Sequence, residues 1–537
     1  METGEPAAIW RLRSLEVAVG EPEAAIRERA CRELAIDPER LRSFRIARKS
    51  LDARRRGGEH RLKFVLHVDL AVDRSFRSSA LSRAKKTGRV VPAPEPYDPR
   101  VERVHPTLAG APRIVIVGAG PAGLFAAWIL ARHGLAVTVL DRGSRVDRRS
   151  RELVRFHRTR IPDPESNLLF GEGGAGTYSD GKVYTRVDDP LEVPILEALV
   201  SAGAPAALLY DGRAHIGTDR LHRLLPVLRS KLEEQGARFL WNTRLEGFDA
   251  RVRVLETSAG PMPCDALFLA VGHSARDTWA TLARLGVPFQ AKPFQVGVRI
   301  EHPQELVDRA QHGAGPEARA LGAAYYQLVS RAEGEVAASH SFCMCPGGRI
   351  VASVNEPGLL CTNGMSNSTH STRYANAAIV ATVEPGGDPF AGVVLQRDLE
   401  RRFFEAGGKD YTAPAQRADD FLEGRPSQRL PGSSFTFGSV PARIDELLPP
   451  HLRDALRAAI ARFDRSIEGF AGEQGILVGV ETRSACPVRI PRDRTTRRAE
   501  GFAHLYPVGE GAGYAGGIMS AAIDGARSAL ALLEHGI

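Results

Sequence analysis

The sequence predicts an α/β fold: a parallel-sheet domain interrupted by a mixed, largely antiparallel domain and preceded by a small α+β domain. Two stretches, residues 113–141 and 266–272, contain short apolar runs of the kind that strands buried on both faces require. A third such run, over residues 503–508, lies near the C-terminus. Between the last two, residues 288–472 contain several segments that alternate as antiparallel strands do.

The first stretch has residues suited to holding a dinucleotide. Its strand ends at Gly118, the letters GAGPAG span the turn, and a helix and a second strand come next. Gly118 permits a tight turn, Gly120 lets the backbone approach a pyrophosphate, and Gly123 lets the helix pack closely on the strand. The helix start offers N–H groups and its dipole to the phosphates. Asp141, at the end of the second strand, is placed to accept hydrogen bonds from a ribose diol.

Two further segments are expected to approach the same nucleotide. Residues 170–186 hold four glycines between positions 171 and 176, which a stable helix or strand interior does not tolerate. We interpret this loop as a backbone wall beside a flat ring, and a flexible surface loop is the alternative. The strand that ends in Ala270-Val271-Gly272 allows a second close approach, because its last residues are small.

The C-terminal segment, residues 503–537, indicates whether the predicted dinucleotide is FAD or NAD. A strand leads into Gly509 and Glu510, which suit a chain bending past a ribityl–pyrophosphate bridge, with the acid accepting from a hydroxyl. A long helix then opens at Gly517 and can aim its dipole at the pyrimidine edge of a flavin, which becomes negatively charged on reduction. A redox ring that stays bound favours FAD over NAD.

These segments together predict one FAD site, and we assign no residue to a metal site. The residues predicted to bind the cofactor are Gly118, Gly120, Pro121, Ala122, Gly123, Asp141, Arg142, Gly173, Gly174, Ala175, Gly176, Ser179, Asp180, Lys182, Ala270, Gly272, Gly509, Glu510, Gly516, Gly517 and Ile518.

Five segments are expected along the chain. The first has the element order βαββα, which predicts a ferredoxin-like half-sandwich. The segments are a basic α+β accessory domain (1–86), a proline-rich linker (87–110), the first part of the FAD-binding domain (111–287), an inserted substrate or cap domain (288–472) and the C-terminal part of the FAD-binding domain (473–537).

Charge is spread unevenly over the 537 residues. Residues 1–110 hold 23 Lys+Arg against 16 Asp+Glu, whereas the rest holds 49 against 48. The excess positive charge therefore belongs to the N-terminal segment. No apolar run approaches the roughly 20 residues that span a bilayer, the N-terminus lacks the apolar core of a secretory signal, and the six cysteines form no CxxC. We expect a cytoplasmic protein without a membrane association.

With these residues assembled, the chain resembles the glutathione-reductase-type FAD proteins, and more narrowly a family of uncharacterised bacterial FAD-dependent dehydrogenases. The resemblance covers essentially the whole chain. It implies noncovalent FAD, an interrupted Rossmann-like domain and an N-terminal accessory unit, and the family more often has a small hydroxyl residue where Cys486 stands. The motifs that carry it are VGAGPAGLFAA, FGEGGAGTYSDGKVYTR, AVGHSARDTW, FCMCPGG, NGMSNSTHSTRYANAA, ETRSACPVRIPR and VGEGAGYAGGIMSAAIDG.

We therefore predict an FAD-dependent oxidoreductase that transfers a hydride or electrons to or from a small molecule. The flavin performs the redox chemistry, and the protein orients it and excludes competing reactions. Residues 171–176 repeat the GxGxxG pattern, but no convincing helix follows them, so we expect no separate nicotinamide-binding Rossmann domain, and NADH or NADPH would act only as a transient donor on the substrate side. A catalytic acid or base is not assigned, and the candidates are His340, His273, Lys182, Tyr178 and Arg483.

Cys343 and Cys345 stand out in the inserted segment. We expect the two side chains to lie on opposite faces of a strand, so core packing is favoured over disulfide or metal chemistry. Disulfide reductase activity is disfavoured, because the sequence lacks a pair of cysteines spaced for it.

Two alternative functions stay open at this stage. The basic N-terminal segment could bind RNA in an FAD-dependent RNA-modifying or RNA-associated protein, although its basic hairpin carries no interleaved aromatic residues for stacking, which disfavours a nucleic-acid partner. Alternatively, FAD is structural and the insertion binds a partner protein. The sequence predicts neither the substrate nor the oligomeric state.

Overall fold

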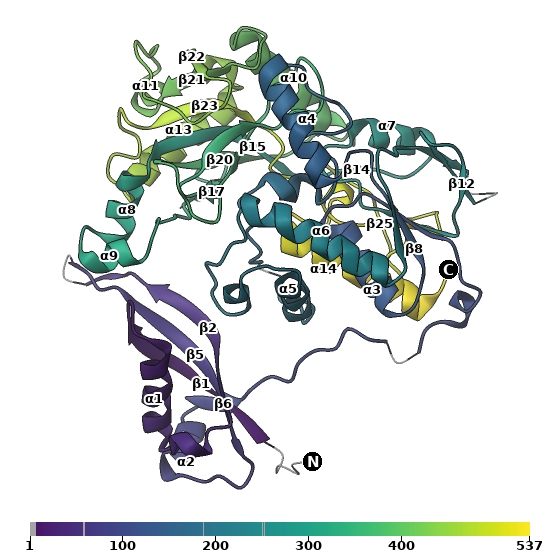
Figure 1. Cartoon of the computed structure of the whole chain (residues 1–537). Helices are drawn as coiled ribbons and strands as arrows, with labels where there is room; N and C mark the ends of the chain where they lie inside the picture. Colours follow the sequence, from purple (N-terminus) through teal and green to yellow (C-terminus); the bar gives the residue numbers. More distant parts are fainter. Residues whose placement is uncertain (1–6, 57–58, 102, 186, 250, 252) are drawn as a thin grey trace. The chain divides into compact units, whose positions relative to one another are not determined.

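The computed structural model describes residues 7–56, 59–101, 103–185, 187–249, 251 and 253–537, with the side chains of 55–60 left out (Figure 1). The chain divides into two compact units. One comprises the described residues up to Asp98 together with Pro205–Ala214 and Asp308–Ala324, and the other comprises Pro99–Ala204, His215–Val307 and Tyr325–Ile537. In the part of the chain that the structure describes, no helix has both the length and the apolar character that a bilayer span requires.

The first unit contains a four-stranded antiparallel sheet. Its order is β2 (Ser43–Asp52), β5 (Lys63–Asp73), β1 (Ala7–Ala18) and β6 (Val90–Pro92). Helices α1 (Glu23–Leu34) and α2 (Ser79–Lys86) complete the order βαββαβ, which is the ferredoxin-like arrangement. The predicted half-sandwich is therefore present, and β6, inside the segment predicted as a linker, completes it. Leu12, Leu34, Leu66 and Val68 form its core.

The second unit is built on a five-stranded parallel sheet. Its order is β25 (Leu505–Pro507), β13 (Ala266–Leu269), β7 (Ile114–Val117), β8 (Val137–Leu140) and β9 (Ala237–Leu240), and every neighbouring pair is parallel. The four residues of β7 and of β13 are all buried, as their continuous apolar runs predict. The predicted parallel sheet is confirmed.

Two helices from opposite ends of this unit pack together beside the sheet. They are α3 (Pro121–Arg132) and α14 (Ile518–His535) (Figure 1). A Cβ added to Gly525 of α14 would lie 1.9 Å from the carbonyl oxygen of Ala122 in α3. Only glycine allows this backbone approach, which sets the two helices against each other.

A seven-stranded, largely antiparallel sheet forms the rest of the core. Only its last pair is parallel. Strand β23 (Ile476–Glu481) lies within the segment predicted as the C-terminal part of the FAD-binding domain, yet it pairs with β15 (Phe294–Pro303) and β21 (Ala413–Arg417) of this sheet. The domain boundaries stay a prediction. The strand order is β16 (Val329–Ser330), β17 (Ser339–Cys345), β20 (Tyr374–Val383), β15 (Phe294–Pro303), β23 (Ile476–Glu481), β21 (Ala413–Arg417) and β22 (Ser439–Pro441).

Smaller elements connect these sheets. The short paired strands are β3 (Arg55–Arg56) with β4 (Glu59–His60), β10 (Leu245–Asp249) with β11 (Val254–Thr257) and β12 (Met262–Pro263), β14 (Gln290–Ala291) with β24 (Val488–Arg489), and β18 (Arg349–Ala352) with β19 (Thr362–Met365). The remaining α-helices are α4 (Val146–Thr159), α5 (Glu192–Ser201), α6 (Thr218–Glu234), α7 (Arg276–Arg284), α8 (Gln304–His312), α9 (Pro316–Ala320), α10 (Ala391–Ala406), α11 (Ala418–Glu423), α12 (Ile444–Leu447) and α13 (Pro450–Asp464). The 3-10 helices are η1 (Pro38–Arg40), η2 (Pro106–Leu108), η3 (Gly174–Tyr178), η4 (Ala206–Leu209) and η5 (Glu510–Ala512).

Candidate flavin site

One cavity of about 750 Å³ gathers most of the residues predicted from the sequence. It lies where β7 and β13 end and where α3 and α14 begin, and residues of β17 also line it. Such volumes are typical of ligand pockets. The predicted residues that line it are Gly118, Gly120, Pro121, Ala122, Asp141, Gly174, Ala175, Gly176, Ser179, Asp180, Lys182, Ala270, Gly272, Glu510, Gly516, Gly517 and Ile518.

The turn after β7 is shaped by glycine. Gly118 has a φ of 108°, and a Cβ at this position would lie 2.2 Å from the carbonyl oxygen of Ala270. A Cβ on Gly174 would lie 3.2 Å from the Cα of Gly120, so the glycine loop passes directly beside the turn. Helix α3 begins after Gly120 without a side-chain cap. Its first N–H groups are therefore available to an anionic group in the cavity.

Asp141 fastens the turn to its neighbours. Its Oδ2 accepts from the backbone N–H of Ala119 at 2.8 Å, and its Oδ1 accepts from those of Gly143 and Gly171 at 2.9 Å each. Burial raises the pKa of this carboxyl, and the three N–H donors oppose that rise. Asp141 also lines the cavity. Its predicted bond to a ribose stays a prediction, but its role in joining three loops was missed.

Arg149 of α4 holds the glycine loop in place. Its guanidinium is fully buried and donates to the carbonyl oxygens of Asn167 at 2.6 Å, Glu172 at 2.8 Å and Gly174 at 2.8 Å. This network fixes the loop as a wall and contradicts the alternative of a flexible surface loop. Arg149 was missed from the sequence, because one arginine in a strongly basic segment carries no signal of its own.

The start of α14 closes the opposite side of the cavity. Gly517 precedes the helix without a side-chain cap, and a Cβ on Gly516 or Gly517 would meet no atom within 4 Å. Both glycines line the cavity, so this backbone faces open space rather than packed side chains. Two uncapped helix starts and a glycine wall around one cavity fit a bound FAD, whose pyrophosphate and reduced ring are both negatively charged.

Comparisons with known proteins identify the cofactor class. Residues 293–484 match the family described as "FAD-dependent protein, C-terminal domain-like", and residues 116–156 match the family described as "NAD(P)-binding Rossmann-like domain". An uncharacterized protein from Clostridium beijerinckii is 36% identical over 98% of this chain and 98% of its own length. The chain belongs to this family of FAD-dependent proteins. A domain of unknown function matches residues 11–71.

Solved structures with a similar chain path are far more distant. L-proline dehydrogenase from P. horikoshii is 12% identical, with a TM-score of 0.34, over 79% of this chain and 93% of its own. Glycine oxidase from Geobacillus kaustophilus is 11% identical, with a TM-score of 0.30, over the same two shares. Likenesses this weak say nothing about the substrate. The family matches confirm the predictions of FAD, of a Rossmann-like domain and of an FAD-dependent oxidoreductase family.

Four residues predicted to bind FAD are not among the described residues that line the cavity. Gly123 and Gly173 instead permit close packing, since a Cβ would lie 1.9 Å from the Gly118 oxygen and 2.2 Å from Thr177 Oγ1, respectively. The N–H of Gly509 donates to Asp524 at 2.7 Å. The guanidinium of Arg142 is bound by the carboxylates of Glu165 and Asp277, and its predicted contact with FAD stays a prediction.

Lys182 is held as a cation at the edge of the FAD cavity. Its Nζ donates to the carboxylate of Asp180 and to the carbonyl oxygen of Met344. Burial lowers the pKa of this ammonium group, but the attraction and hydrogen bond of Asp180, together with Cys345 and Cys343, raise it more. Lys182 therefore acts as a fixed positive charge rather than as a proton acceptor at neutral pH.

Asp180 also faces two histidines that were not connected with it from the sequence. Ligand atoms of Asp180, His215 and His370 lie within 4.8 Å of one another, and the Nε2 atoms of both histidines are buried without a hydrogen-bond partner in the described structure. The imidazoles are stacked at 4.1 Å, and Lys182 already occupies the carboxylate. Stacked rings do not aim their nitrogen atoms at one point, so this arrangement does not favour a metal ion.

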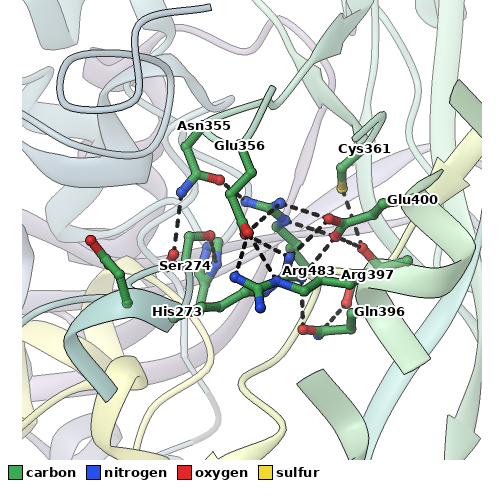
Figure 2. Close-up of polar contacts among 12 residues, drawn as sticks. His273, Ser274, Asn355, Glu356, Cys361, Gln396, Arg397, Glu400 and Arg483 are labelled. Atoms are coloured by element: carbon green, nitrogen blue, oxygen red, sulfur yellow. Dashed lines mark hydrogen bonds and ion pairs between the residues drawn. The ribbon is translucent and has the colours of Figure 1, made fainter. Parts of the chain in front are cut away.

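Arg483 reaches the FAD cavity from a buried ionic cluster (Figure 2). Its Nε and Nη2 donate to the two carboxylate oxygens of Glu400 at 2.9 and 2.8 Å, and its Nη1 donates to Asn355. Arg276 of α7 bonds to the same carboxylate at 2.8 and 2.9 Å. The cluster therefore joins the nucleotide-binding side, through α7, to the inserted helix α10, and it fixes the orientation of Arg483.

The candidate acid–base residues differ in their surroundings. His340, His273, Lys182 and Arg483 line the cavity, whereas Tyr178 does not and bonds through its hydroxyl to Ser150 at 2.9 Å. Burial, together with Arg483 and Arg276, lowers the pKa of His273 to about 4. His273 is therefore neutral at pH 7, with its Nδ1 bonded to Ser274 Oγ at 2.8 Å.

Glu510 gives the FAD site a pH dependence. Burial raises its pKa to about 8 against the attraction of Lys292, so at neutral pH this carboxyl is largely protonated and can donate a hydrogen bond, while its predicted acceptance from a hydroxyl stays a prediction. As pH rises through about 8, the site gains a negative charge beside a cofactor that is itself anionic. We expect FAD affinity to fall by about tenfold between pH 7 and 9.

The measurement is the dissociation constant of FAD by fluorescence quenching at several pH values. Glu510→Gln should remove most of the decrease, because its amide does not ionise. A decrease that is equally large in the variant would exclude Glu510 as its source.

Proposed function

We propose that the protein transfers a hydride or electrons between bound FAD and a small molecule that occupies the same cavity. One observation carries this proposal: the cavity is lined both by the nucleotide-binding turn and by residues of the inserted sheet, among them His340, Ser341 and Cys343 of β17. A purely structural cofactor would not need polar and ionisable side chains from a second domain on the other side of its cavity. The inserted sheet supplies these side chains.

FAD, when bound, supplies the two-electron chemistry. The chain supplies position and charge. The uncapped N-terminus of α14 would stabilise negative charge on the reduced ring, and Lys182 adds a fixed cation at the cavity edge. Arg483 is held rigidly by Glu400 and can bind an acidic or carbonyl group of a substrate. His273 is neutral and can accept a proton within the site.

The proposal is tested on the purified full-length protein. We expect a yellow protein whose flavin is released by heat, which would show noncovalent binding. Anaerobic addition of NADH and of NADPH, in separate samples, should bleach the flavin band slowly, because we expect a nicotinamide to enter only from the substrate side. A colourless protein that takes up no added FAD contradicts the proposal. Bound FAD that no donor or substrate mixture reduces would favour the structural role.

The RNA-associated alternative stays a prediction. In the described part of the first unit, Arg11 and Arg45 both bind Asp69, and Lys63 binds Glu16. These contacts neutralise part of the positive charge on which that alternative depends. Residues 55–60, in the middle of the basic hairpin, have side chains outside the described part.

A further inference from the structure

The two cysteines of β17 lie together rather than apart. Residues two apart in a regular strand share a face, so the expectation of opposite faces was wrong on geometry alone. Here the strand also bulges between Phe342 and Cys345, and Cys343 has a φ of 44°. The Cys345 thiol donates to the carbonyl oxygen of Cys343 at 3.3 Å, which brings the Cys345 sulfur back toward the preceding cysteine.

Two cations lie beside this pair, and each is itself paired with a carboxylate: Lys182 with Asp180, and Arg299 with Glu481. Lys182 binds the carbonyl oxygen of the intervening Met344. Arg299 of β15 is fully buried and donates to the Cys343 carbonyl oxygen at 3.0 Å, with the same nitrogen 3.9 Å from Cys345 Sγ. The hydrogen bond from Cys345 and these two cations lower the pKa of the Cys343 thiol to about 6, against burial and Asp180, while the pKa of Cys345 is raised.

The pair is also divided between the cavity and the core. Cys343 lines the cavity that holds the FAD-binding turn, whereas Cys345 is fully buried behind it. The other cysteines, Cys31, Cys264, Cys361 and Cys486, are all buried, and burial raises the pKa of each. An accessible thiolate backed by a buried thiol is the arrangement of a nucleophilic cysteine and its resolving partner.

We propose that Cys343 and Cys345 form a redox-active dithiol–disulfide pair that exchanges two electrons with FAD. This inference rests on the proposed function and names one electron partner of the flavin within the chain. In the forward direction the Cys343 thiolate and the Cys345 thiol join through a new Sγ–Sγ bond. The Cys345 S–H bond breaks, and its proton and the two electrons pass to oxidised FAD to give FADH⁻. The reverse direction would leave the pair reduced for attack by Cys343 on a disulfide or another two-electron acceptor.

The pair can be followed in one peptide. Trypsin releases residues 332–349, which contain both cysteines and no other. After treatment of the holoprotein with diamide and alkylation under denaturing conditions, we expect this peptide to be unalkylated and to lack two hydrogens. Anaerobic titration of the same sample with dithionite should consume two more electrons per FAD than in Cys345→Ser, and the peptide should return as the dialkylated dithiol.

A second measurement does not depend on the cofactor. In FAD-free protein at pH 7, we expect iodoacetamide to modify Cys343 roughly tenfold faster than an ordinary thiol, with a midpoint well below the usual range for cysteine. Cys31→Ala, in the core of the other unit, is the matched control and should change neither the peptide nor the electron count.

The possible results distinguish three claims: that the two cysteines form a redox pair, that the protein binds FAD, and that the pair exchanges electrons with FAD. A peptide that never forms the internal bond, or a bond that persists after the flavin is fully reduced, would overturn the redox pair while leaving FAD binding intact. A protein that binds no FAD but still links the two cysteines and shows the fast thiolate would contradict the proposed function and not the pairing. Equal electron counts in the wild type and in Cys345→Ser would exclude exchange with FAD.

Discussion

Gly118→Ala should yield a nearly colourless protein with at least a hundredfold weaker affinity for FAD. A Cβ at this position would lie 2.2 Å from the carbonyl oxygen and 2.8 Å from the carbonyl carbon of Ala270, and both atoms are backbone. The φ of 108° is also unfavourable for alanine. The end of β7 must therefore move away from β13, and that movement displaces the turn from the cofactor. A loss of about 3 kcal/mol in binding corresponds to roughly a hundredfold.

The measurement is the ratio of flavin to protein absorbance after purification, followed by titration of the FAD-free protein with FAD. Gly110→Ala is the matched control, because a Cβ added to this glycine would meet no atom within 4 Å and its φ is not positive. It should bind FAD as the wild type does. Full flavin content in Gly118→Ala would show that this turn does not hold the cofactor.

The nucleotide-binding side of the molecule could be predicted because it depends on local backbone demands. Gly118, Gly120 and Gly517 are needed where they stand for reasons that act within a few residues: a positive φ, a close approach or an open helix start. Backbone constraints of this kind produce a recognisable pattern of neighbouring residues in the sequence. The same holds for β7 and β13, whose apolar runs reflect burial on both faces.

The polar parts of the site could not be predicted, because their partners are distant in sequence. Arg149 of α4 bonds to Gly174, which lies 25 residues further along the chain. Arg299 of β15 bonds to Cys343 of β17, 44 residues away, past the intervening strand β20. Arg142 shows the same limit: its cofactor contact stays a prediction, and its ion pairs with Glu165 and Asp277, 23 and 135 residues away, could not be foreseen. A charged residue in the sequence gives no information about which oppositely charged residue will lie beside it in the folded protein.

Glu400→Gln should lower the free energy of unfolding by about 3–5 kcal/mol and reduce FAD retention. The carboxylate is fully buried and is the shared partner of Arg276 and Arg483, whose side chains are only 2% and 4% exposed. Thr482 also donates to it at 2.5 Å. With a neutral amide in its place, Arg483 loses its nearest anion and Arg276 keeps only Glu356, so the desolvation of the two guanidinium groups is less well offset. Arg483 would then lose its fixed orientation in the cavity.

Asp398→Asn in the same helix is the control, since its side chain is 60% exposed and pairs only loosely with Arg401 at 3.9 Å. It should change the free energy of unfolding by less than about 0.5 kcal/mol.

The pH dependence of the free energy of unfolding distinguishes the ionic contribution of Glu400 from its packing. The two arginines hold the pKa of Glu400 well below its usual range, so its stabilisation is fully present at neutral pH and declines as pH falls below about 4, where the unfolded chain becomes protonated. Urea unfolding should therefore show a gap between the wild type and Glu400→Gln that narrows between pH 7 and pH 3. A gap that stays constant would mean that the shape of the side chain, and not its charge, joins α10 to the nucleotide-binding side.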